Sequence, residues 1–116
     1  MKVEIYHITR CRKSREALNY LQDEGHEVEV FEYLKEVPSR EEFQKVLAKL
    51  NLKPSDLLRK GETLFKEKFK GMGFNEDEWL DVMLEHPKLI ERPIVIRGNK
   101  AVVGRPLENV IRLLES

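Results

Sequence analysis

The sequence contains one cysteine, Cys11, in 116 residues. A lone cysteine excludes a disulfide within the chain and is typical of a reducing compartment, so we expect a cytoplasmic protein. No apolar run approaches the length of a membrane-spanning helix, so we expect a soluble protein. Lys2 and Glu4 place charges where a secretion signal needs an uninterrupted apolar core. We therefore predict neither a leader segment nor a membrane partner.

An excess of charge of one sign is missing as well. Lys and Arg together number 21, as do Asp and Glu, so the formal net charge is zero. Proteins that bind nucleic acid generally carry a net basic surface, and we predict no nucleic-acid partner. The chain also lacks repeats, low-complexity segments and linkers, and its length suits one hydrophobic core. We predict a single domain over residues 1–116 with no bound metal or cofactor.

The only cysteine lies where a predicted strand gives way to a predicted helix. Val3 and Ile5 alternate with polar residues, which is typical of a strand. After Cys11 the apolar period changes to that of a helix, with Ser14, Ala17, Leu18 and Leu21 on one face. The first amides of a helix are unpaired and its dipole is positive there, so a cysteine at this position is favoured as a thiolate.

Four basic residues surround the cysteine in the sequence: Arg10, Arg12, Lys13 and Arg15. Positive charges favour the ionised form of a thiol, and we expect Arg12, Lys13 and Arg15 to help stabilise a Cys11 thiolate. A lone cysteine is more often a small buried hydrophobic residue. A core cysteine gains nothing from four cations and a helix start, and the reactive interpretation is favoured.

Two polar neighbours leave alternatives open. Ser14 occupies the position of the second cysteine in a C-x-x-C redox motif, where it either hydrogen-bonds the thiolate or is an ordinary first-turn serine. His7 stands four residues before Cys11 at the predicted strand end. Its imidazole either stabilises the thiolate, as a hydrogen-bond donor or as a cation, or is a partly exposed group without a role.

The remaining patterns predict the order of elements. A helix ending at Gly25 separates the first strand from a second at 27–31, and helices begin near Ser39, Pro54 and Asn75 with one or two helical turns within 62–73. A hairpin follows, with strands at 94–96 and 101–103 and a turn at 97–100, and a last helix begins at Pro106. The order βαβ, a helical insert at about 39–87, then ββα predicts a thioredoxin-like α/β fold with a four-stranded mixed sheet flanked by helices.

Three arginines stand beside prolines, glycines or helix ends: Arg59, Arg92 and Arg105. Each alone is more often a solvated surface charge. In a thioredoxin-like sheet, however, Arg92 and Arg105 belong to the end that faces the cysteine loop. Guanidinium groups bind tetrahedral oxyanions through two parallel hydrogen bonds, whereas lysine offers a point charge. A thiolate surrounded by arginines suits an oxyanion whose central atom the sulfur attacks.

With these residues together, the sequence resembles the ArsC family of glutaredoxin-dependent arsenate reductases. The resemblance covers nearly the whole chain and rests on segments in matching order: Ile5-Tyr6-His7 before Cys11, Ser14-Arg15, Tyr33-Leu34, Pro38-Ser39-Arg40, Leu57-Leu58-Arg59-Lys60, Met83-Leu84-Glu85-His86-Pro87, Ile90-Glu91-Arg92-Pro93-Ile94-Val95 and Gly104-Arg105-Pro106. The family usually has Asn-Pro after the histidine, and this chain has Ile8-Thr9.

The resemblance implies a role for each site residue. Cys11 is the expected nucleophile and His7 its assistant, while Arg59, Arg92 and Arg105 are expected to bind arsenate, or a similar oxyanion, and the covalent intermediate. Glutathione and glutaredoxin are the implied reductants, and arsenical resistance the implied biological role. The resemblance also implies a cis peptide bond at Arg92–Pro93.

Two alternatives remain at this stage. One is a general thiol oxidoreductase that acts on glutathione mixed disulfides. The other is a regulatory module similar to the Spx transcription regulators, which bind RNA polymerase and often sense redox state through C-x-x-C. Ser14 in place of a second cysteine weakens such a switch. The arginine set favours catalysis, because a regulator needs no arginines around its thiol.

Overall fold

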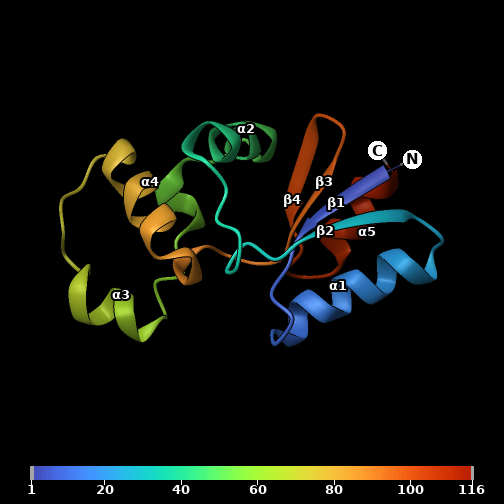
Figure 1. The fold of residues 1–116 in the computed structure, drawn as a ribbon, viewed down its shortest axis with the longest axis horizontal. Helices are drawn as coiled ribbons and strands as arrows, with labels where there is room; N and C mark the ends of the chain where they lie inside the picture. The colour runs from blue at the N-terminus through green and yellow to red at the C-terminus, as the bar shows by residue number, and fades with distance from the viewer. Residues whose placement is uncertain (1, 116) are drawn as a thin grey trace. The chain divides into compact units, whose positions relative to one another are not determined.

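The computed structural model describes residues 2–115. Val37–Glu91 forms one compact unit, and the described residues before and after it form the other. The elements of both units are coloured along the chain in Figure 1. The sequence places a helical insert at about 39–87, and the unit Val37–Glu91 includes that range. That the two units make one domain stays a prediction.

The sheet lies in the unit formed by the two ends of the chain. β1 (Lys2–Tyr6) pairs in parallel with β2 (Glu27–Phe31), and its other edge pairs antiparallel with β3 (Ile94–Arg97). β4 (Lys100–Val103) pairs antiparallel with β3, so the order across the sheet is β2-β1-β3-β4. This is the four-stranded mixed sheet that the sequence predicts, in the βαβ and ββα halves of a thioredoxin-like fold.

One face of the sheet packs against α1 (Arg12–Asp23) and α5 (Glu108–Glu115). The buried cluster takes alternate residues from the strands and residues three or four apart from the helices: Val3, Ile5, Ala17, Leu21, Val95, Val110 and Leu113. Burial of such side chains stabilises the fold by roughly 1.5–3 kcal/mol each. Because β1 and α1 both contribute to this core, the loop between them, which carries Cys11, is anchored at both ends. Gly25 has a φ of 79° just after α1, as predicted for its left-handed cap.

Two sequence-based boundaries were wrong. The hairpin turn is Gly98-Asn99 rather than 97–100, because Gly98 takes a φ of 62° and lets the strands pair up to Arg97 and Lys100. The last helix begins at Glu108 rather than Pro106. The side-chain amide of Asn109 donates hydrogen bonds to the carbonyls of Val103 and Arg105, which holds that backbone in a turn before the helix.

The second unit contains helices and no named strand: α2 (Arg40–Leu50), η1 (Pro54–Leu57), α3 (Thr63–Lys68), α4 (Glu76–Glu85) and η2 (Pro87–Leu89). The predicted capping boxes are confirmed at Ser39 with Glu42 and at Asn75 with Glu78. A single β-bridge joins Leu58 to Ile90 and brings the segments that flank it together.

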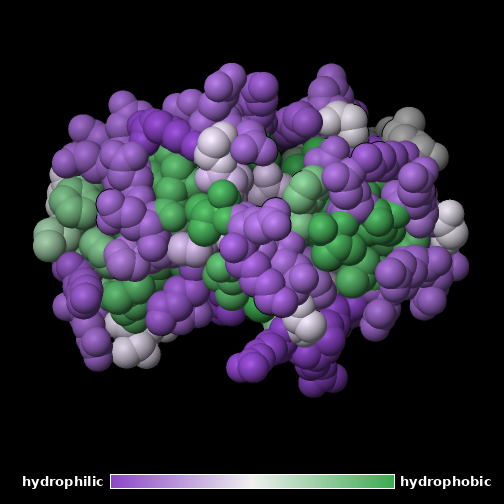
Figure 2. Space-filling model, in the orientation of Figure 1, coloured by the Kyte–Doolittle hydropathy of each residue, from purple (hydrophilic) through white to green (hydrophobic). Residues whose placement is uncertain are grey.

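The surface is mainly hydrophilic, with several hydrophobic patches visible on the face drawn in Figure 2. Large hydrophobic side chains that are exposed include Val30, Phe31 and Leu34 in the sheet unit and Met72 in the helical unit. Among the described residues, no helix has the length and apolar character that a bilayer crossing requires.

Candidate functional site around Cys11

Cys11 is the N-cap of α1, with extended backbone angles of φ −84° and ψ 121°. Its own N–H donates to the carbonyl of Ile8 at 3.0 Å, and its carbonyl accepts the N–H of Arg15 at 3.0 Å. The backbone of Cys11 therefore closes the loop from β1 and opens the first turn of α1. The thiol is partly exposed, so the sulfur is accessible for reaction.

Arg105 contacts the cysteine from the far end of the chain. Its Nη2 lies 3.6 Å from Cys11 Sγ, although the two residues are 94 positions apart. The Nε–H of the same guanidinium donates to the backbone carbonyl of Arg92 at 3.0 Å, which fixes the orientation of the group. With Nε engaged by this carbonyl, Nη2 is the nitrogen of the group that lies beside the sulfur. Arg92 and Arg105 therefore lie at the end of the sheet that carries the cysteine loop, as the sequence predicts.

A close backbone contact holds these arginine segments in place. The N–H of Gly104 donates to the carbonyl of Pro93 at 2.7 Å. A Cβ at position 104 would lie 2.9 Å from Pro93 Cγ and 3.1 Å from Val110 Cγ2, so a larger residue would force Pro93 to shift and would crowd Val110. Glycine allows this close approach without such a shift. The Arg92–Pro93 peptide bond is cis, as predicted, and so is Arg105–Pro106.

The environment lowers the pKa of Cys11 below its ordinary value. Partial burial is the largest single influence and raises the pKa. The hydrogen bond from the backbone N–H of Ser14 and the guanidinium groups of Arg92 and Arg105 lower it, and together they outweigh burial. Each of these groups donates to, or attracts, the negative sulfur. The result is a thiol with increased thiolate character at a helix N-terminus.

His7 and Ser14 form a buried pair behind the cysteine loop. Ser14 is fully buried, and its Oγ lies 2.5 Å from His7 Nδ1 while accepting the Ile8 N–H at 3.1 Å. The Ser14 hydroxyl has a proton and a further lone pair left for the imidazole, and the tautomer of His7 sets which group donates. Ser14 therefore serves the thiolate through its backbone N–H and uses its side chain to fix the loop.

The pKa of His7 is lowered because burial outweighs the opposing charge of Glu32; the charge of Arg15 lowers the pKa further, and the Ser14 backbone opposes this more weakly. A lowered pKa favours the neutral imidazole at neutral pH. The alternative of a partly exposed imidazole is wrong, because His7 is 5% exposed. The geometry favours His7 as a positioning residue that acts through Ser14 and the loop backbone.

The basic residues that neighbour Cys11 in sequence lie at the surface. Arg10, Arg12, Lys13 and Arg15 are all exposed. Arg15 donates from Nη1 to the Thr9 carbonyl at 3.2 Å, which braces the loop. The groups that lower the pKa of Cys11 most are Ser14, Arg92 and Arg105. Thiolate stabilisation by Arg12, Lys13 and Arg15 stays a prediction.

Arg59 belongs to the helical unit. Its Nη1 pairs with Glu62 at 3.0 Å and its Nε with Glu91 at 3.2 Å, while its backbone N–H donates to the Leu89 carbonyl at 2.7 Å. The Arg59 side chain is 21% exposed, so the two carboxylates hold a largely buried guanidinium. Its expected oxyanion-binding role stays a prediction.

A pocket of about 310 Å³ lies beside the cysteine loop, lined by His7, Ile8, Thr9, Arg10, Glu32, Leu34 and Lys35. Thr9, which replaces the proline of the family pattern, donates from Oγ1 to Glu32 at 2.7 Å. Sequence reasoning missed Glu32 and Lys35. The available signal was topological, because both follow β2, and the carboxyl ends of parallel β1 and β2 meet at one edge.

The fold and site define a class: a thioredoxin-like α/β protein with a single, partly exposed cysteine at a helix N-terminus. The model of the ArsC family matches residues 6–113. The chain belongs to the ArsC family.

Individual relatives support the same assignment. The chain is 38% identical to an arsenate reductase of Neisseria meningitidis over 97% of this chain and 98% of that protein. It is 37% identical to an arsenate reductase of Haemophilus influenzae over 98% of this chain and all of that protein. Among solved structures, an arsenate reductase of Vibrio cholerae superposes with a TM-score of 0.91 at 41% identity, covering 97% of each chain.

Proposed function

We propose that this protein reduces arsenate, or a chemically similar oxyanion, with Cys11 as the nucleophile and with glutathione and glutaredoxin as the reductants. Family membership and the names of the relatives support the substrate. The observation that carries the chemistry is the guanidinium of Arg105 beside Cys11 Sγ. An oxyanion bound by that group lies next to the sulfur that attacks it.

In the first step, the Cys11 thiolate attacks the arsenic of bound arsenate. A sulfur–arsenic bond forms, an oxygen leaves with two protons as water, and arsenic remains As(V). Arg105 offers Nη2, which lies beside the sulfur, to the oxyanion, while the Arg92 carbonyl engages its Nε and fixes the group. The Ser14 N–H and the guanidinium groups that favour the thiolate also keep the sulfur ionised before attack.

In the second step, the thiol of glutathione attacks Cys11 Sγ. The sulfur–arsenic bond breaks, and its electron pair leaves on arsenic, which becomes As(III) and departs as arsenite. The two sulfurs are oxidised together to one mixed disulfide, which balances the two electrons gained by arsenic. A glutaredoxin thiol then attacks the glutathione sulfur and releases the Cys11 thiolate. An ionised, well-stabilised Cys11 is a good leaving group for this last exchange.

An NADPH-coupled assay with glutathione, glutathione reductase and glutaredoxin tests the proposal. Arsenate and a glutathione mixed disulfide are supplied as separate substrates, with Cys11→Ser as the control protein. Turnover of arsenate that requires Cys11 supports the proposal. Turnover of the mixed disulfide alone selects the general thiol oxidoreductase. Activity with neither substrate, together with capture of RNA polymerase, selects the regulator.

The lone cysteine makes a stoichiometric prediction. Because Ser14 cannot resolve a mixed disulfide, brief treatment with oxidised glutathione should add one glutathione to the native protein, and glutaredoxin should remove it. Intact mass spectrometry measures the adduct, and Cys11→Ser should show none. A native protein that reacts only after denaturation would overturn the mechanism.

A further inference from the structure

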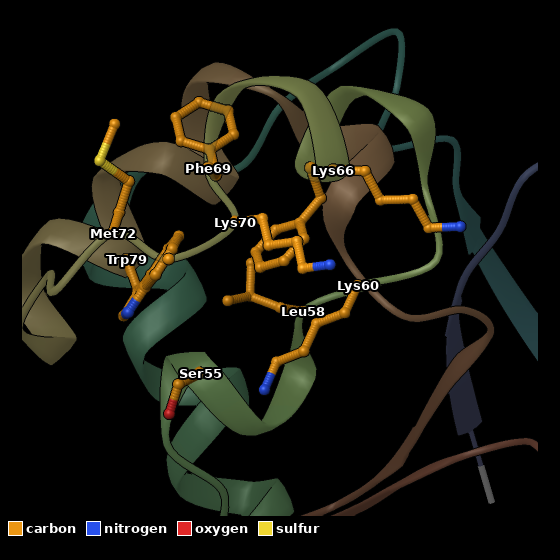
Figure 3. Close-up of a pocket in the computed structure, with 10 residues that line it drawn as sticks. Ser55, Leu58, Lys60, Lys66, Phe69, Lys70, Met72 and Trp79 are labelled. Atoms are coloured by element: carbon orange, nitrogen blue, oxygen red, sulfur yellow. The ribbon is translucent and has the colours of Figure 1, made fainter.

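The helical unit contains a pocket that the proposed reaction does not use. Its volume is about 480 Å³, within the range of roughly 300–1,000 Å³ typical of small-molecule sites. Its lining is aromatic and aliphatic on one side and basic on the other (Figure 3). Leu58, Phe65 and Trp79 are buried, so they form the floor of the pocket.

The apolar wall is a packed aromatic cluster. The ring centroids of Phe65 and Phe69 lie 5.9 and 6.4 Å from that of Trp79, and Phe74 packs edge-on against Trp79 at 5.0 Å. Tilted and edge-on rings at these distances are stable arrangements that fix side-chain positions. Met72, which is 49% exposed, extends the apolar surface outward. A flat apolar group can contact this wall without rearranging it.

The basic side consists of lysines without acidic partners. Within residues 2–115, no carboxylate forms an ion pair with Lys60, Lys66 or Lys70. In Figure 3, the ammonium of Lys66 points away from Trp79 and Met72, which leaves Lys60 and Lys70 as the cations of the pocket. The nearby carboxylate of Glu76 is engaged by the N–H and hydroxyl of Ser55, which lines the same pocket.

We propose that this pocket binds small organic acids in which a flat aromatic body carries one anionic group. The body packs on the Phe65–Phe69–Trp79 wall, and the anion faces Lys60 and Lys70. A neutral molecule of the same shape lacks the ionic contact, and a cation is repelled. The site is independent of the chemistry at Cys11.

The chain supplies its own probe, because Trp79 is the only tryptophan. Its indole N–H gives a single resolved signal in a ¹H–¹⁵N correlation spectrum, so binding in the pocket is seen directly. The probes are 2-naphthylacetate and the neutral and cationic analogues 2-(2-naphthyl)ethanol and 2-(2-naphthyl)ethylamine. We expect saturable shifts of the indole signal with the acid, binding of the alcohol about threefold weaker or more, and of the amine at least about tenfold weaker.

Two variants test the lysines. Lys60→Gln/Lys70→Gln should reduce binding of the acid to the level of the alcohol and leave the alcohol unchanged. Lys68→Gln is the matched control, since Lys68 is the last residue of α3, lies between Lys60 and Lys70 in the sequence, and does not line the pocket. Raising the salt concentration should weaken binding of the acid and spare that of the alcohol. Absence of a saturable shift, equal affinity for the three probes, or an equal loss in Lys68→Gln would each overturn the proposal.

Discussion

Two sets of basic residues neighbour Cys11, one along the sequence and the other in space. Arg10, Arg12, Lys13 and Arg15 surround it in the sequence, and all four side chains are exposed. Arg92 and Arg105 are more than eighty residues away, and they supply the guanidinium groups that lower its pKa. Side chains in a first helical turn project outward from the axis, whereas a segment from another strand end can approach the sulfur directly. Distance along the chain is therefore a poor guide to electrostatic influence at this site.

The segments that carry Arg92 and Arg105 are held by close backbone contacts. Gly104 and Pro93 are hydrogen-bonded at 2.7 Å, and a Cβ at position 104 would force the Pro93 ring to shift. The guanidinium of Arg105 donates a hydrogen bond to the backbone carbonyl of Arg92. The backbone carbonyl of Arg105 accepts a hydrogen bond from the side-chain amide of Asn109. A fixed donor loses little conformational freedom when it binds an anion, so the distant pair is better suited to catalysis than solvated neighbours.

Removal of the proposed nucleophile has the largest expected effect. Cys11→Ser should lower arsenate turnover roughly a thousand-fold or more, because serine is not ionised at neutral pH and cannot form the mixed disulfide. The coupled assay measures this, and thermal unfolding checks that the fold is retained. Substantial residual turnover would mean that neither set of cations serves a catalytic thiol.

Substitutions of arginine by lysine separate the effect of charge from that of guanidinium geometry. Arg105→Lys should lower turnover roughly ten- to a hundred-fold, because lysine keeps the charge and loses the paired donors, each worth about 1.5–3 kcal/mol. Arg92→Lys should act in the same direction. Arg12→Lys is the matched control and should stay within about twofold. Equal losses at positions 12 and 105 would show that general attraction, not geometry, governs the reaction.

Arg59→Lys extends the same series into the helical unit. Loss of turnover comparable to that of Arg105→Lys would support an oxyanion role. A lower unfolding temperature with unchanged turnover would instead assign Arg59 to its ion pairs with Glu62 and Glu91.

A smaller effect is expected from the backbone contact. Gly104→Ala places a Cβ against Pro93 and Val110, and overpacking of this kind costs about 1–3 kcal/mol of unfolding free energy. Turnover should fall severalfold as the Arg105 segment shifts away from Cys11. Gly73→Ala is the control, since a Cβ there meets nothing within 4 Å. Denaturant unfolding measures the stability change, and an undisturbed Gly104→Ala would refute the proposed constraint.

Local patterns predicted much of the fold because they depend on neighbours in the chain. The change of period at Cys11 located the helix start, and the capping residues Ser39 and Asn75 located two more. The hairpin and the last helix were misjudged by a few residues. Local periodicity does not encode the feature that decided each boundary. For the hairpin this is the positive φ of Gly98, and for the helix it is the hydrogen bond from the Asn109 amide.

The sequence identified most residues of the site but not the contacts that each of them makes. Cys11, Arg92 and Arg105 were selected from the sequence, and the structure brings them together. The pairing of Ser14 Oγ with His7 instead of the thiolate depends on a buried side-chain orientation that no spacing encodes. The need for glycine at position 104 arises only when two distant segments touch.

The most direct test of the central claim is the pH dependence of Cys11 alkylation by iodoacetamide. A lowered pKa keeps the thiolate populated to lower pH, so the rate should decline only as the pH falls through a midpoint below the ordinary cysteine value. Arg105→Gln should raise the midpoint, and Arg12→Gln should move it less. A wild-type midpoint at or above the ordinary value, or a larger shift in Arg12→Gln than in Arg105→Gln, would contradict the account.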